Sequence, residues 1–124
     1  MAHIKPTGSF VALVTPMNAD GSIDYQGFRT LIDWHAENGT SALLIMGSTG
    51  EVSMLAPEER REIVRRTMAM RRPEMTMWYG CTGNNTDTTI AQVQFAAAEG
   101  ADGAIIAAPS YICADNAAIE AYAL

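Results

Sequence analysis

The sequence predicts an α/β fold in which parallel strands alternate with helices. Four continuous apolar runs occur along the chain, and each is followed by a stretch of helix type. The runs begin about 30 residues apart, which is the size of one βα unit. Polar loops rich in Gly, Ser, Thr and Asn follow the runs, whereas the connections that precede them are short. Because right-handed crossovers make all the strands parallel, these polar loops should gather at one edge of the sheet.

The predicted strands are continuously apolar and do not alternate between apolar and polar residues. This pattern is typical of strands that are covered on both faces, as in a parallel sheet. The four predicted strands span residues 9–16, 41–46, 75–80 and 102–109.

The predicted helices follow the strands. They span residues 25–38, 57–72, 87–99 and 115–124. In the first helix, Phe28, Leu31 and Ile32 share one face at helical spacing. The second helix begins at Pro57, and the helix dipole favours Arg71 and Arg72 in its last turn. The predicted inward-facing residues of the third helix are Ile90, Val93 and Ala97.

Four βα units correspond to half of a (βα)8 barrel, because a complete barrel takes about 250 residues. An isolated half would expose two sheet edges, and the sequence ends inside the fourth predicted helix. We therefore expect residues 1–124 to be the N-terminal half of a TIM (βα)8 barrel. An open flavodoxin-like sheet is the alternative, but the loop TPMNADGS after the first strand offers no clear phosphate site.

Composition and charge limit the possible partners. The chain is 48% apolar with a formal net charge of −6, which indicates a globular protein and argues against nucleic acid. No apolar run is long enough for a membrane span, and the first residues lack the apolar segment of a secretory signal, so a cytoplasmic location is expected.

Glutamates interleave the clustered arginines, which favours a solvated, salt-bridged helix face over an anion site. These arginines are Arg60, Arg61, Arg65, Arg66, Arg71 and Arg72.

The cysteines and histidines form no recognisable metal pattern. Cys81 and Cys113 do not make a CxxC pair, and their spacing to His3 or His35 is not that of metal ligands. Reduced, partly buried thiols are therefore expected. We expect His35 to lie near the end of the first helix, where a positive charge is mildly favoured.

The loop after the second strand reads GSTGE at residues 47–51. It lacks the lysine of a phosphate-binding GxxxxGK[ST] loop and is not a dinucleotide GxGxxG motif. The hydroxyls of Ser48 and Thr49, with backbone N–H groups, could instead form a small neutral cradle for a carboxylate or carbonyl oxygen. Gly47 and Gly50 would let the backbone approach a ligand closely. A purely structural turn remains an open interpretation, because Gly, Ser and Thr are ordinary turn formers.

Four sequence blocks resemble the dihydrodipicolinate synthase and N-acetylneuraminate lyase family of Schiff-base aldolases. The blocks ALVTPMNADGSID, GSTGEVSML, YGCTGNN and APSY occur in the family's order, each at a strand end, and cover nearly the whole chain. The resemblance implies a (βα)8 barrel in a homotetramer of tight dimers, and for a synthase a role in lysine biosynthesis. It also implies condensation or cleavage of pyruvate and an aldehyde through an imine on a barrel lysine, without a metal or organic cofactor.

The resemblance also implies roles for individual residues. Ser48 corresponds to a member of a proton relay, and Thr49 to the residue that holds the carboxylate of the pyruvyl group. Tyr111, in the block APSY, corresponds to a tyrosine that crosses the tight dimer interface to complete the neighbouring subunit's relay. A tyrosine that merely caps the barrel mouth with its hydroxyl in water is the structural alternative.

Other residues near these motifs have predicted supporting roles. Glu51 is predicted to organise its loop by accepting backbone N–H groups, and Thr15 and Pro16 to line the site. Lysine feedback in some synthases uses an acidic residue and a tyrosine where this chain has Thr89 and Ser110, so insensitivity to lysine is predicted.

The family's imine lysine has no counterpart within these residues. Lys5 is the only lysine and precedes the first strand, where no burial could lower its pKa for imine chemistry. The family's lysine and second relay tyrosine belong on later strands, so residues 1–124 alone should not catalyse the reaction. Three functions stay open: a synthase-like aldolase, a lyase for N-acetylneuraminate or another sugar acid, and a non-catalytic half-barrel that oligomerises through its open edges.

Overall fold

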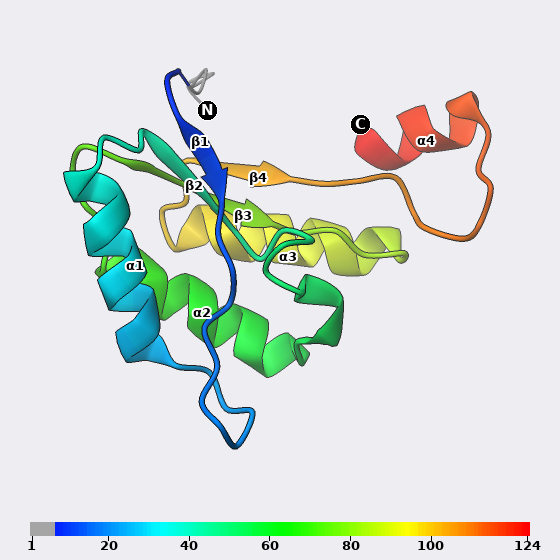
Figure 1. Ribbon diagram of the computed structural model, residues 1–124. Coiled ribbons are helices and arrows are strands. Elements are labelled where there is room, and N and C mark those ends of the chain that lie inside the picture. Colours follow the sequence, from blue (N-terminus) through cyan, green and yellow to red (C-terminus); the bar gives the residue numbers. More distant parts are fainter. Residues whose placement is uncertain (1–6) are drawn as a thin grey trace.

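The computed structural model describes residues 7–124, so the predictions that concern His3 and Lys5 lie outside the described residues. Strands and helices alternate along the chain, and a short 3-10 helix, η1, precedes α2 (Figure 1). The elements are β1 (Phe10–Ala12), α1 (Tyr25–Glu37), β2 (Ala42–Ile45), η1 (Val52–Met54), α2 (Pro57–Ala69), β3 (Thr76–Gly80), α3 (Thr86–Ala98), β4 (Gly103–Ile105) and α4 (Asn116–Ala123).

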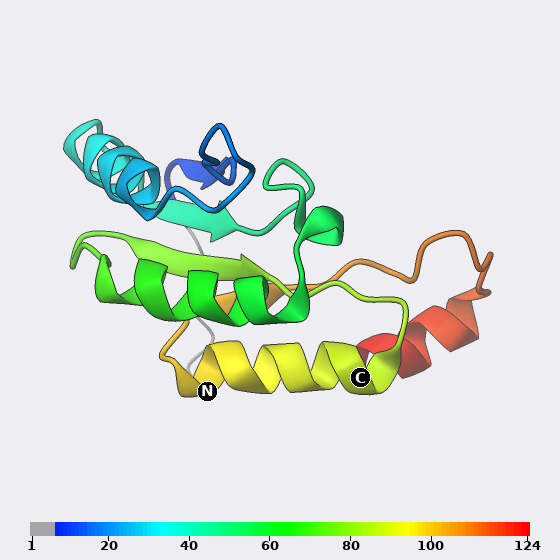
Figure 2. The same ribbon diagram turned by 90° about the horizontal axis from the view of Figure 1, so that it is seen from below.

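The strands form one parallel sheet in the order β1-β2-β3-β4, which confirms the predicted serial βα arrangement. Each strand therefore pairs with the strand of the next βα unit. Figure 2 shows that α1, α2 and α3 follow one another along one side of the curved sheet, and that α4 lies near the start of α3. This is the arrangement of consecutive units in a (βα)8 barrel.

Three of the helices begin at a capping side chain at the end of a polar loop. Asp24, Asn85 and Asp115 each accept a hydrogen bond from the backbone N–H three residues further on, at 2.8 to 2.9 Å. These bonds satisfy N–H groups that the first turn of a helix leaves without partners. The caps therefore fix where the loops after β1, β3 and β4 end.

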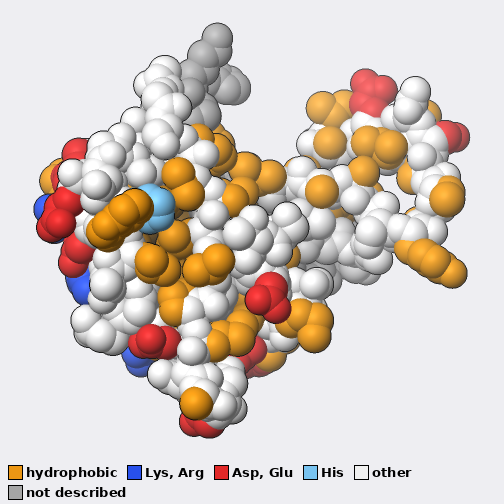
Figure 3. Space-filling model, in the orientation of Figure 1, with side chains coloured by type: hydrophobic (Ala, Val, Ile, Leu, Met, Phe, Trp, Pro, Cys, Tyr) orange, Lys and Arg blue, Asp and Glu red, His pale blue; other side chains and the backbone are white. Residues whose placement is uncertain are grey.

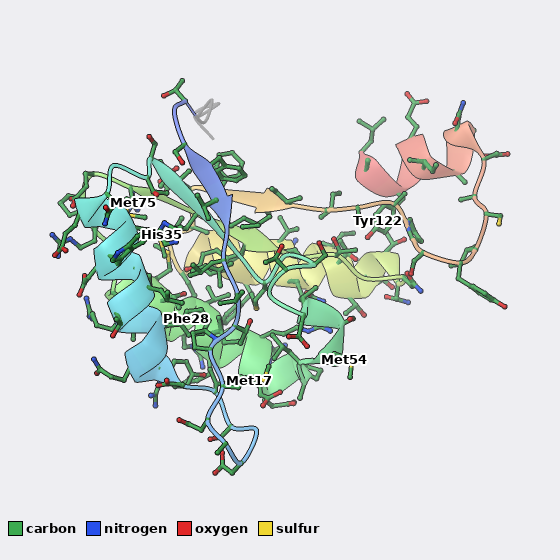
Figure 4. The ribbon with its side chains drawn as sticks, viewed as in Figure 1. Met17, Phe28, His35, Met54, Met75 and Tyr122 are labelled. Carbon is green, nitrogen blue, oxygen red and sulfur yellow. The ribbon has the colours of Figure 1, made fainter. Side chains whose placement is uncertain are left out.

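The helix-covered face of the sheet forms the hydrophobic core. Leu43, Met77 and Tyr79 are fully buried, and the Tyr79 hydroxyl lies 2.8 Å from the Thr67 hydroxyl of α2. Phe28 reaches this core from α1, and Figure 4 shows it in the interior between α1 and α2. The predicted buried face of the first helix is confirmed, because Phe28 and Ile32 are both inaccessible to solvent.

The opposite face of the sheet is apolar but incompletely covered. Trp78 alternates with Tyr79 along β3 and so points away from the helices. The Phe10 ring packs edge-on against Trp78 with 5.7 Å between ring centroids, and Phe10 remains 39% exposed. Gly103 lies directly against the Trp78 ring, which would overlap any Cβ there. Hydrophobic side chains are accordingly visible over the strands in Figure 3, while charged side chains gather along the margin on the α1 side.

Two helix predictions need correction. Arg71 and Arg72 do not lie in α2, which ends at Ala69, because the residue before Pro73 is disfavoured in helical conformation. Ile90 is 47% exposed and is not part of the core. It lines the shallow space between α3 and α4, where the described chain provides too few neighbours to cover it.

The predicted salt-bridged face of the arginine cluster is confirmed for four of its six members. Arg66 pairs with Glu62 one turn earlier, and Arg65 reaches Glu99 after α3. Arg71 pairs with Asp102, and Arg72 with Asp33 and Glu74. Most of these pairs therefore link α2 and its following turn to neighbouring elements.

Candidate functional site

The loops after the four strands meet at the carboxyl edge of the sheet, as the parallel arrangement requires. The buried Thr15 hydroxyl, after β1, donates a 2.6 Å hydrogen bond to the Gly50 carbonyl after β2. The Ala107 N–H, after β4, donates to the Thr82 hydroxyl after β3 at 3.0 Å. Neighbouring loops are thus tied together in pairs.

The 47–51 loop is a compact turn that closes on its own backbone. The Gly50 N–H donates to the Gly47 carbonyl, and the Glu51 N–H to the Ser48 carbonyl, both at 3.1 Å. Met46, just before the loop, and Glu51, its last residue, adopt left-handed φ values of 59° and 54°. Non-glycine residues in this region carry strain that a surrounding structure must hold, and such residues cluster at functional sites.

Gly80 is a structural requirement for this loop that sequence analysis missed. A Cβ at Gly80 would collide with the Met46 carbonyl, because the backbone entering the loop lies directly on the end of β3. Gly50 is also closely surrounded, since a Cβ there would lie 3.1 Å from the Leu13 carbonyl oxygen and 3.2 Å from Met46. The signal for Gly80 was a glycine at the end of an apolar strand, which often marks close backbone approach.

The loop presents the two predicted hydroxyl residues to solvent. Ser48 and Thr49 are both exposed, and their hydroxyls form no hydrogen bond within residues 7–124. Thr15, predicted to line the site, is instead buried beneath the loop, where it holds the Gly50 carbonyl. The predicted role of Glu51 is wrong. Its carboxylate is exposed and caps no helix, and its contribution is the left-handed backbone that starts η1.

Tyr111 lies in a different environment. It is fully exposed, with a left-handed φ of 70°, in the loop between β4 and α4. The preceding residue, Ser110, is held by its backbone N–H, which donates to the Asn84 side-chain oxygen at 3.0 Å. Figures 1 and 2 both show this loop well apart from the loop between β2 and η1. One chain therefore does not bring Tyr111 together with Ser48 and Thr49.

The two residues behind the predicted lysine insensitivity are engaged in structural contacts. The Thr89 hydroxyl lies 2.9 Å from the Tyr122 hydroxyl, which donates to the Gly83 carbonyl at 2.7 Å. Figure 4 shows Tyr122 between α4 and the loop before α3. The Ser110 hydroxyl lies 3.3 Å from the Asn84 side-chain oxygen. Neither Thr89 nor Ser110 can supply a carboxylate or an aromatic ring to an amino acid.

The remaining candidates have structural roles. Cys81 is buried and Cys113 exposed, so only the first fits the expected burial, and both thiols are free. Burial raises the pKa of the Cys81 thiol to about 11. His35 lies 3.0 Å from the Thr40 hydroxyl and packs edge-on against Trp34. Within residues 7–124, His, Cys, Asp and Glu form no cluster that could hold a metal ion, and no helix could span a membrane.

The model of the dihydrodipicolinate synthetase family matches residues 5–123 of this chain. The chain belongs to the dihydrodipicolinate synthetase family. Among its relatives, 4-hydroxy-tetrahydrodipicolinate synthase of Alcanivorax borkumensis is 40% identical over 104 residues, which are 84% of this chain and 35% of that protein. The synthase of Neisseria gonorrhoeae is 43% identical over 104 residues, or 84% of this chain and 36% of that protein.

Solved structures of family members share the observed fold. Dihydrodipicolinate synthase from Acinetobacter baumannii, complexed with pyruvate, gives a TM-score of 0.92 at 30% identity over 96% of this chain and 41% of that one. YagE, a prophage protein from E. coli K12 also solved with pyruvate, gives a TM-score of 0.89 at 34% identity. The match covers 94% of this chain and 39% of that one. These neighbours are TIM barrels, so the four βα units described here match the first units of that fold. The chain spans little more than a third of the length of its relatives.

Proposed function

We propose that this chain is the N-terminal half of a pyruvate-dependent Schiff-base aldolase of the 4-hydroxy-tetrahydrodipicolinate synthase type. The observation that carries the proposal is the 47–51 loop, which is braced by buried contacts and leaves two adjacent hydroxyls exposed. Family membership and the pyruvate bound in two similar structures support the same chemistry. The imine lysine would come from residues outside this sequence, because Lys5 is the only lysine in it.

The geometry of the loop supports the predicted division of roles. The N–H groups of Gly50 and Glu51 already bond within the loop, so the hydroxyl and N–H groups of Ser48 and Thr49 are the donors left, and those of Thr49 would hold a pyruvyl carboxylate. Ser48, one residue earlier, would move protons to and from the substrate oxygen as imine formation and aldol addition require. Gly47 and Gly50 allow the turn to be tight enough for both roles.

The partner for this site would be a second copy of the chain. The exposed Tyr111 supports the proposal that it completes the relay of a neighbouring subunit in a tight dimer, within a cytoplasmic homotetramer. We propose no metal or organic cofactor, because the lysine imine itself acidifies the methyl group of pyruvate.

Borohydride trapping tests the proposed chemistry in the full-length protein. Reduction in the presence of pyruvate should add the pyruvate-derived mass to one lysine, and omission of pyruvate should abolish the adduct. A second assay, with an aldehyde as the acceptor for pyruvate or with a sugar acid as the substrate, separates the synthase from the lyase direction. Absence of any lysine adduct in folded protein would refute the aldolase proposal and favour a non-catalytic carboxylate-binding module.

Substitutions test the two hydroxyls. Thr49→Val should raise the KM for pyruvate, whereas Ser48→Ala should chiefly lower kcat by about 100-fold, the usual contribution of one proton-transfer group. Ser53→Ala is the matched control, since Ser53 is an exposed serine in η1 outside the turn. Equal kinetics for Ser48→Ala and Ser53→Ala would remove Ser48 from the mechanism.

A further inference from the structure

A concave site lies on the outer side of the molecule, between α2 and α3. Its volume is about 310 Å³, at the lower end of the range typical of small-molecule sites. Ser48, Thr49 and Tyr111 do not line it, so it is separate from the proposed catalytic site. The lining residues are Met46, Pro57, Arg60, Arg61, Val64, Gly80, Cys81, Thr88, Ala91, Gln92 and Phe95.

The interior of this cavity is apolar. Met46 and Cys81 are almost completely buried at the ends of the strands, and Val64 from α2 is buried beside them. Phe95 and Ala91 line it from α3. The Cys81 thiol stays neutral near pH 7, because burial raises its pKa to about 11. Such surroundings favour an uncharged hydrocarbon or aromatic group.

Two cations also line the cavity. Arg60 and Arg61 are the members of the arginine cluster that form no salt bridge within residues 7–124. The Arg60 Nε donates to the Leu55 carbonyl at 3.0 Å, which fixes the side chain but leaves its terminal nitrogens available. The Arg61 guanidinium lies 5.7 Å from the centre of the Phe95 ring. No aspartate or glutamate lines the cavity to neutralise them.

We propose that this cavity binds a small monocarboxylate with an apolar body. The carboxylate would pair with Arg60 and Arg61, since guanidinium groups hold carboxylates through paired charge-assisted hydrogen bonds. The apolar body would lie among Val64, Ala91 and Phe95. A zwitterionic amino acid fits poorly, because its ammonium group would be desolvated without an acidic partner.

Three probes of similar shape test the charge requirement by isothermal titration calorimetry on the full-length protein. Benzoate should bind saturably at one site per chain. Benzyl alcohol, which lacks the charge, should bind at least about tenfold more weakly, and benzylamine should not bind. Equal affinity for the three probes, or no saturable benzoate signal at millimolar concentration, would overturn the proposal.

Matched variants locate the bound benzoate. Arg60→Gln combined with Arg61→Gln should weaken benzoate binding about tenfold or more, whereas Arg66→Gln should leave it unchanged. Arg66 is a suitable control because it lies on the same helix, pairs with Glu62 and does not line the cavity. Loss of affinity in Arg66→Gln equal to that in the double variant would indicate nonspecific charge attraction and refute the site.

Filling the cavity gives an independent test. Ala91→Leu should block benzoate while retaining helix propensity, and Ala98→Leu, on the same helix outside the cavity, should not. Saturating pyruvate should leave benzoate binding intact, and displacement by pyruvate would place benzoate in the catalytic site and overturn the inference. Because these readouts need no catalysis, their failure is distinguishable from failure of the borohydride test.

Discussion

The 47–51 loop and the loop that carries Tyr111 both bear predicted site residues, but their surroundings differ. In the first loop, Thr15 donates a hydrogen bond to Gly50, and the backbone at Met46 packs directly on Gly80. Met46, which has a left-handed φ, is buried. The second contains left-handed residues at Tyr111 and Cys113, and both are exposed. One loop is thus fixed by its own chain, while the other lacks packing at its tip.

Under the proposed function, this difference corresponds to two ways of building one site. Groups that bind a small substrate need a supporting shell that holds their geometry, and the 47–51 loop has one. A residue that acts in a neighbouring subunit needs exposure before assembly, and the partner then supplies its packing. We therefore expect substitutions under the first loop to reduce stability and substitutions at the tip of the second to affect mainly assembly or activity.

The largest loss of stability is expected for Gly80→Ala. The new methyl group would collide with the Met46 carbonyl, and backbone cannot move aside as a flexible side chain can. We expect the free energy of unfolding to fall by about 3 kcal/mol, in the range of overpacked sites. Denaturant unfolding with Gly83→Ala as control measures this, because a Cβ at Gly83 would lie 3.1 Å from the Thr89 hydroxyl, which would need to shift by only a few tenths of an ångström. Equal midpoints for the two variants would contradict the close approach.

Thr15→Val should have the next largest effect. It removes the 2.6 Å hydrogen bond and leaves the Gly50 carbonyl without that donor in a buried position. The expected cost is about 2 kcal/mol, the usual penalty for an unsatisfied buried polar group. Thr15→Ser retains the hydroxyl and should recover most of the loss. If valine and serine destabilise equally, packing of the Thr15 methyl group and not the hydrogen bond holds the loop.

The sequence was sufficient to predict the sheet because its signals are local. Apolar runs, helix periodicity and turn residues gave the order and type of every βα unit. Residues whose roles depend on contacts between different βα units were harder to predict from the sequence. Gly80 is required by a carbonyl 34 positions earlier in the chain, and no local pattern reports such a neighbour. Ile90 followed the helical spacing of a core residue but faces a region where the described chain has little to pack against it.

At the candidate site, too, the features that depend on local sequence were predicted and those that depend on side-chain orientation or on a second chain were not. The composition of residues 47–51 indicated a tight turn that carries two hydroxyls, and the structure has that turn, with Ser48 and Thr49 exposed. The role of Glu51 was wrong because local sequence does not tell whether a carboxylate points at backbone N–H groups or at solvent. The function of Tyr111 depends on a second chain and stays a prediction.

A smaller, pH-dependent effect on stability is expected from Cys81, which follows β3 directly after Gly80. Its thiol pKa is about 11 in the folded protein and near 9 when unfolded, so the unfolded state releases the proton first as the pH rises. Stability should therefore be unaffected below pH 8 and decrease by about 1 kcal/mol by pH 10, since one pKa unit corresponds to about 1.4 kcal/mol. Cys81→Ala should remove this part of the pH dependence in denaturant unfolding, whereas Cys113→Ala should retain it. Identical pH profiles for all three proteins would contradict burial of the thiol.

The smallest effect on stability is expected for Tyr111→Phe. Its side chain is fully exposed, so the free energy of unfolding should change by less than about 0.5 kcal/mol. Under the proposed function, activity of the full-length enzyme should nevertheless fall by about 100-fold, because the lost hydroxyl would belong to the relay. Ile112→Ala, a neighbouring exposed residue without a hydroxyl, should leave kcat nearly unchanged.

Mixing inactive variants distinguishes a tyrosine that acts across the interface from one that acts in its own subunit. Subunits carrying Tyr111→Phe still supply Ser48, and subunits carrying Ser48→Ala still supply Tyr111. If the tyrosine crosses the interface, a mixed dimer regains one intact site, because Ser48 of the first subunit meets the tyrosine of the second. If the tyrosine acts within its own subunit, every site in the mixed dimer lacks one of the two hydroxyls. Recovery of activity on mixing is therefore expected, and its absence in dimers shown to be mixed by mass spectrometry would place Tyr111 outside the neighbour's relay.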